Sequence, residues 1–147
     1  MTLPMAQPPS QPVQARFAHE NGTQLRLQCF VTVRDPEDRV LALRIQGYEG
    51  WCLPGESMLV NESPDDAARR VVATWFETPM QMWLDRVLSF PATGPEDDRW
   101  YLLFVYSADA PANLKATPDT LESKFFAVKD APPAFAMAHK DVWEKLG

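Results

Sequence analysis

Several features that mark specialised proteins are absent from this sequence. It has only two cysteines, Cys29 and Cys52, which form no CxxC pair and have no histidine near them in the chain. Two isolated cysteines in apolar surroundings predict buried thiols and a reducing, cytoplasmic location, and they argue against nucleophilic thiol chemistry. The two histidines, His19 and His139, are too far apart in the sequence to indicate a zinc site.

Positive charge and long apolar runs are also scarce. The chain has 14 Lys and Arg residues against 20 Asp and Glu residues, and its net charge of −6 disfavours non-specific binding to nucleic acid or to acidic membranes. No apolar run approaches the roughly 20 residues that span a bilayer. Residues 1–15 have no charged side chain and no apolar stretch, so no signal peptide is predicted.

The composition that remains predicts one globular domain. A chain of 147 residues suits a single core, and 46% of the residues are apolar while 23% are charged. Residues 1–15 contain four prolines and few large apolar side chains. We therefore predict a mobile tail over residues 1–15 and a domain over residues 16–147.

Hydrophobic periodicity predicts a sheet covered by helices. Residues 25–33 alternate between apolar and polar side chains, a turn follows, and residues 40–45 return as the second strand of a hairpin. Further strands are predicted at 82–90, 100–106 and 124–128, a loop at 108–120, and a last helix at 135–146. This order indicates an α/β (α+β) sandwich, and the wholly apolar run 100–106 suits a central strand.

The clearest helix start lies in the middle of the chain. Ser63 can cap the helix, Pro64 suits its first position, and the two aspartates that follow favour the positive end of the helix dipole. The helix should end near Phe76, because Pro79 disfavours helical geometry in the residue before it.

The segment around this helix start carries the most specific motif. It reads Trp-Cys-Leu-Pro-Gly-Glu from Trp51 and, after a loop, Asn-Glu-Ser-Pro-Asp-Asp-Ala-Ala-Arg-Arg from Asn61. The motif resembles the Nudix box of the MutT-like hydrolases, with Glu62 and Arg70 at the family's glutamate and arginine, seven residues apart. The order of elements extends the resemblance over residues 23–147. It implies a Nudix-type α/β/α sandwich with a central mixed sheet.

The box departs from the family pattern where catalysis is concerned. Glu56 and Asn61 replace glycines, and Glu77 stands at the position of the final glycine. The positions of the family's three helix carboxylates hold Val71, Thr74 and Trp75.

These substitutions remove the oxygen ligands that magnesium requires. Cleavage of a diphosphate needs a cation that neutralises charge and activates water, and Mg²⁺ binds through clustered carboxylates. The helix face made by positions 71, 74, 75 and 78 carries a single kind of oxygen, the threonine hydroxyl, which cannot replace three carboxylates. We predict that ordinary hydrolysis is lost and that no cofactor is bound.

The motif residues have structural and functional interpretations. We expect Glu62 and Arg70 to close the loop onto the helix by a charge-assisted hydrogen bond, although they could be catalytic remnants. Trp75 could stack on a ligand, but we expect it to fill the former metal pocket as a core residue. Candidate ligand-binding residues are Arg44, Trp51, Glu56, Trp75 and Arg99. Candidate substitute metal ligands are Glu56, Glu77, Asp97 and Asp98.

Three functions compete. The first is a binding or regulatory protein that keeps the Nudix scaffold and binds a nucleotide-like small molecule. It would have no nucleic acid or membrane partner, and it could form a homodimer. The second is a Nudix hydrolase of nucleoside diphosphate derivatives that recruits Mg²⁺ or Mn²⁺ through unusual ligands. The third is a structural protein that self-associates through an apolar surface. Loss of the three carboxylates favours the first, but fold alone does not settle function.

Overall fold

The computed structural model describes residues 25–92, 99–136 and 139–147. The predicted tail, 1–15, lies outside these residues. The described elements are β1 (Leu25–Arg34), β2 (Val40–Ile45), β3 (Gly55–Ser57), α1 (Pro64–Trp75), β4 (Trp83–Pro91), β5 (Trp100–Asp109), β6 (Thr120–Phe126) and α2 (His139–Glu144).

The strands form one mixed sheet, as the resemblance implied. Its order is β4-β5-β1-β2-β6, and β3 pairs with β1 beside this path. β1 runs parallel to β5 over its whole length and antiparallel to β2 and β3. β5 therefore lies inside the sheet, between β1 and β4, which is the internal position that its apolar sequence predicted.

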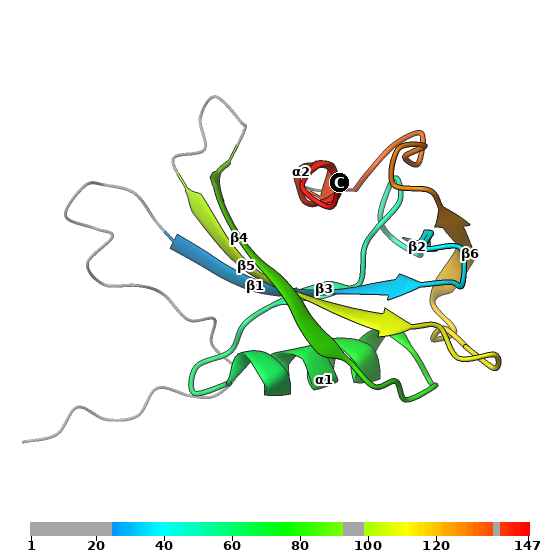
Figure 1. Cartoon of the computed structure of the whole chain (residues 1–147), viewed down its shortest axis with the longest axis horizontal. Coiled ribbons are helices and arrows are strands. Elements are labelled where there is room, and N and C mark those ends of the chain that lie inside the picture. The colour runs from blue at the N-terminus through cyan, green and yellow to red at the C-terminus, as the bar shows by residue number, and fades with distance from the viewer. Residues whose placement is uncertain (1–24, 93–98, 137–138) are drawn as a thin grey trace, which may run out of the picture.

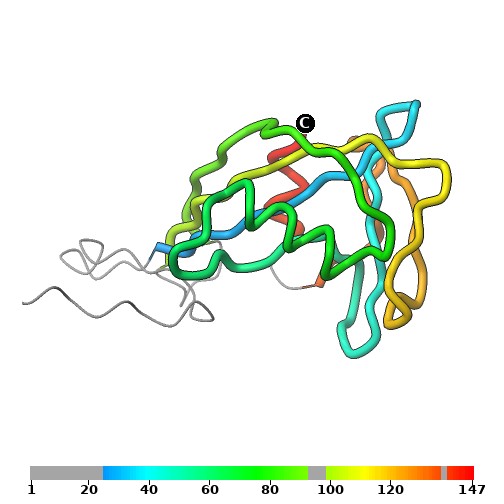
Figure 2. The backbone as a smooth tube through the Cα atoms, turned by 90° about the horizontal axis from the view of Figure 1, so that it is seen from below, coloured from blue at the N-terminus to red at the C-terminus, as the bar shows by residue number. Residues whose placement is uncertain are grey.

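The two helices lie on opposite faces of the sheet (Figure 1). The alternation along β1 supplies both faces, because Cys29 and Val31 pack with α1 while Phe30 packs with Val142 and Trp143 of α2. Figure 2 shows α1 lying along the central strands. The predicted α/β/α sandwich is confirmed.

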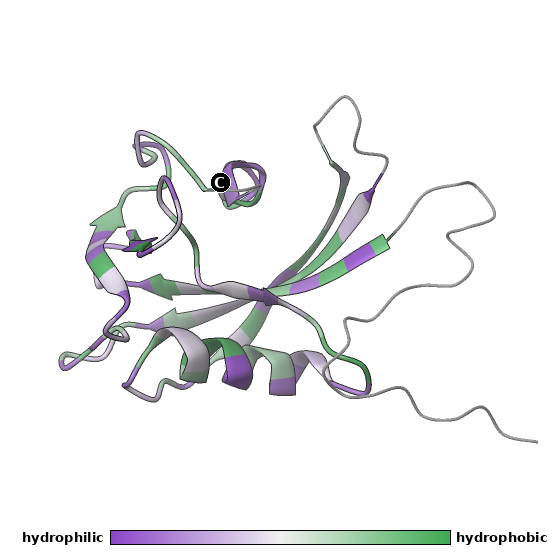
Figure 3. Ribbon diagram, turned by 180° about the vertical axis from the view of Figure 1, so that it is seen from behind, coloured by the Kyte–Doolittle hydropathy of each residue, from purple (hydrophilic) through white to green (hydrophobic). Residues whose placement is uncertain are grey.

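Local chemistry fixes the start of α1. The Ser63 hydroxyl accepts a hydrogen bond from the Asp66 backbone N–H at 3.1 Å, and Pro64 occupies the first turn, where no backbone donor is required. The helix ends at Trp75, and Phe76 follows in extended conformation. Hydrophilic and hydrophobic residues are both present along α1, as an amphipathic helix requires (Figure 3).

Three elements differ from the sequence predictions. The strands of the predicted hairpin share only the pair Arg34 and Val40, because β1 pairs elsewhere with β3 and β5, and β2 pairs with β6. β6 starts at Thr120, inside the predicted loop, because β2 offers it a partner. The last helix is shorter than predicted: in place of a helical turn, Ala136 donates its backbone N–H to the Trp51 carbonyl.

Both cysteines are buried free thiols, as predicted. Burial raises the pKa of Cys29 to about 12 and also raises the pKa of Cys52, so both thiols stay protonated near neutral pH. In the described ranges, no helix is long and apolar enough to cross a membrane.

Candidate functional site

The loop before α1 is held by the predicted ion pair. Arg70 donates from Nε to Glu62 Oε2 at 2.8 Å and from Nη2 to Glu62 Oε1 at 3.1 Å. The same guanidinium donates to the Ser57 carbonyl at 2.7 Å, and Glu62 also accepts from the Leu59 backbone N–H at 3.1 Å. These hydrogen bonds lower the pKa of Glu62, with that from Arg70 contributing most, and they close the loop onto the helix.

Asn61 makes the tight turn that leads into this ion pair. Its φ is +64°, in the left-handed region that most side chains avoid and that asparagine tolerates better than most. The residue at the position of the family's glycine thus still permits the turn.

The residues at the three positions that carry carboxylates in the Nudix pattern differ from one another in their surroundings. Val71 is fully buried in the core below α1, whereas Thr74 is exposed and its hydroxyl donates to the Arg70 carbonyl at 2.8 Å. Trp75 is partly buried. Thr78 does not belong to this helix face, because α1 ends at Trp75 and the Thr78 hydroxyl instead bonds to the backbone of Asn113.

A cavity of about 320 Å³ opens beside the end of α1. We call it the Trp75 cavity. Its walls come from β1, β3, the last turn of α1, the segment 117–119 and the start of α2. The side chains that matter most for its chemistry are Phe30, Tyr48, Glu56, Trp75, Asp119 and His139.

Trp75 is partly buried: it packs against the core cluster that contains Val71, and it also lines this cavity. Its indole Nε1 donates to Glu56 Oε1 at 3.3 Å, so the ring and the carboxylate form one wall. On the neighbouring wall the Thr117 hydroxyl donates to Asp119 Oδ1 at 2.6 Å. The part of the ring that is not packed against the core lines the cavity.

His139 completes the cavity from the opposite face of the sheet. Its Nδ1 accepts the Leu53 backbone N–H at 2.8 Å, and its ring packs edge-on against Phe30 with centroids 5.3 Å apart. Burial lowers the pKa of His139 to about 4, so the ring is neutral at physiological pH. A Cβ at Gly55 would lie 2.3 Å from Phe30, so glycine is required for this packing.

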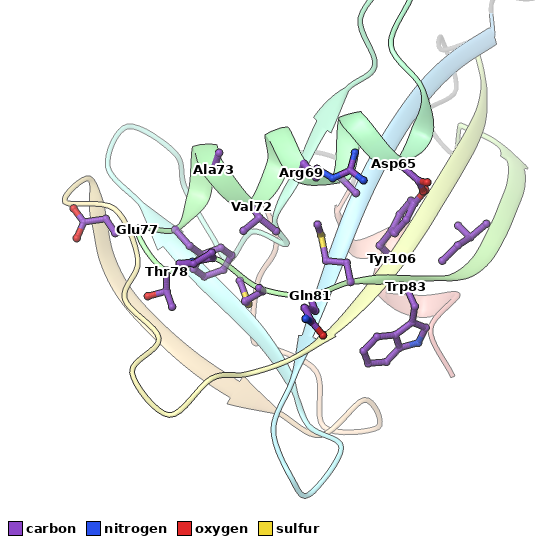
Figure 4. Close-up of a pocket in the computed structure, with 15 residues that line it drawn as sticks. Asp65, Arg69, Val72, Ala73, Glu77, Thr78, Gln81, Trp83 and Tyr106 are labelled. Atoms are coloured by element: carbon purple, nitrogen blue, oxygen red, sulfur yellow. The ribbon is translucent and has the colours of Figure 1, made fainter.

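A second hollow, the outer groove, lies between α1 and the segment 77–84. It encloses about 850 Å³ and is lined by the apolar Val72, Met80 and Met82, with Asp65 and Arg69 at its rim. Figure 4 shows Asp65, Arg69 and Val72 along the helix and Tyr106 below Asp65. The Tyr106 hydroxyl donates a hydrogen bond to the Asp65 carboxylate. It lies along α1 away from the ion pair of Glu62 and Arg70.

Several candidate ligand-binding residues do not reach the Trp75 cavity. Trp51 is only 8% exposed and packs edge-on against Phe126, because β2 and β6 enclose its ring. Arg44 is exposed and forms an ion pair with Glu122 at 3.7 Å. Arg99 precedes β5, where its carbonyl accepts the Ala92 backbone N–H, and it lines neither hollow.

The candidate substitute metal ligands are separated. Glu56 lines the Trp75 cavity, whereas Glu77 lines the outer groove and pairs with Lys115 at 3.1 Å. Asp97 and Asp98 lie outside the described residues. Within the described parts of the chain, no group of three or more His, Cys, Asp or Glu side chains is placed to hold a metal ion.

Sequence reasoning missed Asp119 and gave His139 no role in the site. Asp119 stands in a loop with no motif around it, and His139 is 86 residues from the backbone group that it binds. Their proximity to Trp75 depends on how the segments pack across the sheet, and a single sequence carries no signal for it.

The fold is similar to solved MutT and Nudix structures. A MutT protein from Methanosarcina mazei Go1 matches with a TM-score of 0.61 and 16% identity, covering 82% of this chain and 91% of the other. The NUDIX domain of Shewanella oneidensis NrtR, complexed with ADP ribose, matches with a TM-score of 0.57 and 15% identity, covering 81% and 84%. An ADP-ribose pyrophosphatase from Streptococcus suis matches with a TM-score of 0.57 and 21% identity, covering 82% and 86%.

No family model and no curated protein matches the sequence. The structural matches show that the chain has the fold of the Nudix hydrolases, which is the class that its box motif resembles.

Proposed function

We propose that this chain is a Nudix-superfamily protein that has lost ordinary magnesium-dependent pyrophosphohydrolase activity and acts as a binding or regulatory protein for a nucleotide-like ligand. One observation carries the proposal: Val71, at a carboxylate position, is fully buried in the core under α1. A carboxylate cannot be placed there without burying its charge, so this end of the helix is built for packing.

The remaining scaffold supports a role in binding. The Glu62–Arg70 pair keeps the loop in place although the helix carboxylates are gone. The Trp75 cavity lies next to that helix end and is close to the roughly 300 Å³ at which small-molecule pockets begin. A structural neighbour of this chain is complexed with ADP ribose, which makes ADP-ribose the first ligand to test.

The test combines turnover and binding on the same protein. ADP-ribose, nucleoside triphosphates and dinucleoside polyphosphates are assayed for hydrolysis with Mg²⁺ and with Mn²⁺, and the panel is repeated by isothermal titration calorimetry. We expect saturable binding of at least one compound and no turnover. Turnover that needs a divalent metal would overturn the loss of activity, and the absence of any binding would overturn the binding role.

A hydrolase with unusual metal ligands is the alternative, favoured by the two carboxylates, Glu56 and Asp119, that line one cavity. In that case Glu56→Gln should abolish Mn²⁺-dependent turnover. Glu77→Gln serves as the matched control, because Glu77 lies in the outer groove and its loss should leave turnover unchanged.

Self-association also stays a prediction. Leu84 and Val87 are each 50% exposed on β4, which is an edge strand, and such a strand can pair with a second copy. Size-exclusion chromatography with light scattering measures the oligomeric state directly. The cytoplasmic location remains a prediction from cysteine usage.

A further inference from the structure

The charge of the Trp75 cavity restricts which part of a ligand can enter it. Its described lining contains two carboxylates, Glu56 and Asp119, and no lysine or arginine. Arg70 does not line the cavity: its Nε and Nη2 donate to Glu62 and to the Ser57 carbonyl, and its charge also interacts with Glu56. A carboxylate accepts hydrogen bonds and cannot donate them, so these walls present acceptors and negative charge.

His139 adds a donor without adding charge. Because Nδ1 accepts the Leu53 backbone N–H, the hydrogen of the neutral ring must lie on Nε2. The side chain is only 7% exposed and lines the cavity. Among the described residues only the Thr120 hydroxyl is fully buried without a partner, so Nε2 remains accessible to a ligand or to water.

The aromatic residues define the shape of the group that fits. Trp75 and Tyr48, which is 54% exposed, contribute ring surface to the walls, whereas Phe30 is only 3% exposed and backs the cavity from the core. Flat rings gain dispersion and stacking energy against such walls. A cavity of about 320 Å³ is at the lower end of small-molecule pockets, so it suits a ring with a small substituent and not a whole dinucleotide.

We propose that the Trp75 cavity binds an uncharged or cationic heteroaromatic ring of the nucleobase type, with N–H donors toward Glu56 and Asp119 and an acceptor toward His139, and that it excludes phosphate. This inference rests on the proposed binding function and names the part of the ligand that the cavity recognises. A phosphate monoester carries roughly two negative charges, which two wall carboxylates repel in the absence of a metal ion.

The experiment compares nucleosides with their own phosphates. Adenosine, guanosine, cytidine and uridine, and the 5′-mono- and diphosphate of each, are titrated into the full chain in EDTA by calorimetry. We expect at least one nucleoside to bind as tightly as its phosphates or more tightly. Phosphates that bind about tenfold more tightly than every parent nucleoside would overturn this inference and leave the binding function intact. No binding by any compound would overturn both.

A charge-neutral variant tests the physical cause. Glu56→Gln combined with Asp119→Asn keeps the acceptor for the Trp75 indole but removes both negative charges. It should raise monophosphate affinity about tenfold relative to the nucleoside. Asp109→Asn with Glu144→Gln removes the same charge from exposed residues outside the cavity and should leave that ratio unchanged. Equal shifts in both double variants would overturn the proposal, because only overall charge would then matter.

Discussion

The beginning and the end of α1 meet very different surroundings. Ser63 caps the start of the helix, and about two turns further Arg70 binds Glu62 and the loop backbone with three hydrogen bonds. Val71, the next residue, is sealed in the core, and Trp75 at the end of the helix lines a cavity. Glu62 and Arg70 hold the loop, whereas at the positions where the Nudix pattern has carboxylates Val71 packs in the core and Trp75 lines a cavity.

The loop is held by hydrogen bonds that involve none of the residues at the three carboxylate positions. Of those three residues, Val71 is buried in the core, Thr74 is exposed at the edge of the cavity, and Trp75 lies between the core and the cavity. Substitutions at each end of α1 should therefore have effects of different kinds.

The largest effect is expected in the core below α1, for Val71→Glu. A carboxylate in place of this fully buried side chain has no described cation beside it, and we expect a loss of about 3–5 kcal/mol in the free energy of unfolding. Urea denaturation measures it. Thr74→Glu is the control, since that side chain is exposed and the change should cost less than about 1 kcal/mol.

A triple variant with glutamate at 71, 74 and 75 should unfold, because the glutamate at 71 places a charge in the core. A folded triple variant that cleaves ADP-ribose with magnesium would contradict the picture of a helix end committed to packing.

The next effect is a pH dependence that arises at His139. Burial lowers its pKa in the folded chain from 6.5 to about 4, so the unfolded chain takes up a proton at a higher pH than the folded chain does. The stability that this creates is present above about pH 6.5 and is lost as the pH falls toward 4, on the order of 3 kcal/mol. His139→Asn, whose Oδ1 can still accept the Leu53 N–H, should flatten the stability profile in this window. Parallel profiles for the two proteins would refute the assignment.

Midway along the helix, Arg70→Ala should lower the free energy of unfolding by about 1–3 kcal/mol. The change leaves Glu62, whose side chain is only 10% exposed, without its main partner. Arg69→Ala is the matched control on the same helix, because its ion pair with Asp66 is exposed on both sides and should contribute less than about 1 kcal/mol. If Arg70→Ala melts like the parent and like Arg69→Ala, the ion pair of Glu62 and Arg70 does not hold the loop.

The smallest effect on stability is expected for Trp75→Ala. Because the ring is partly exposed at the cavity, its loss should cost about 1–2 kcal/mol, less than the roughly 3–5 kcal/mol typical of a buried aromatic residue. Ligand affinity should fall about tenfold in the same variant. Trp143→Ala, in the core under α2, supplies the buried reference. Equal costs for the two tryptophans would show that Trp75 is a core residue after all.

The sequence by itself determined the elements whose signals are local. The alternation in β1, the Ser63 cap and Pro64 start of α1, and the spacing of Glu62 and Arg70 each depend on residues close together in the chain, and all appear in the structure. The box motif also indicated the α/β/α sandwich. These signals work because periodicity, capping and short-range pairing need no knowledge of distant segments.

Only the tertiary structure decided what surrounds the end of α1. Trp75 reads as a core residue on an apolar helix face, yet packing left a cavity beside its ring and set Glu56 against its indole. β6 extends to Thr120 because β2 offers backbone partners, and His139 reaches the cavity because α2 covers the sheet where Leu53 lies. Each contact joins residues far apart in the chain, so its existence follows from the packed fold and not from any local pattern.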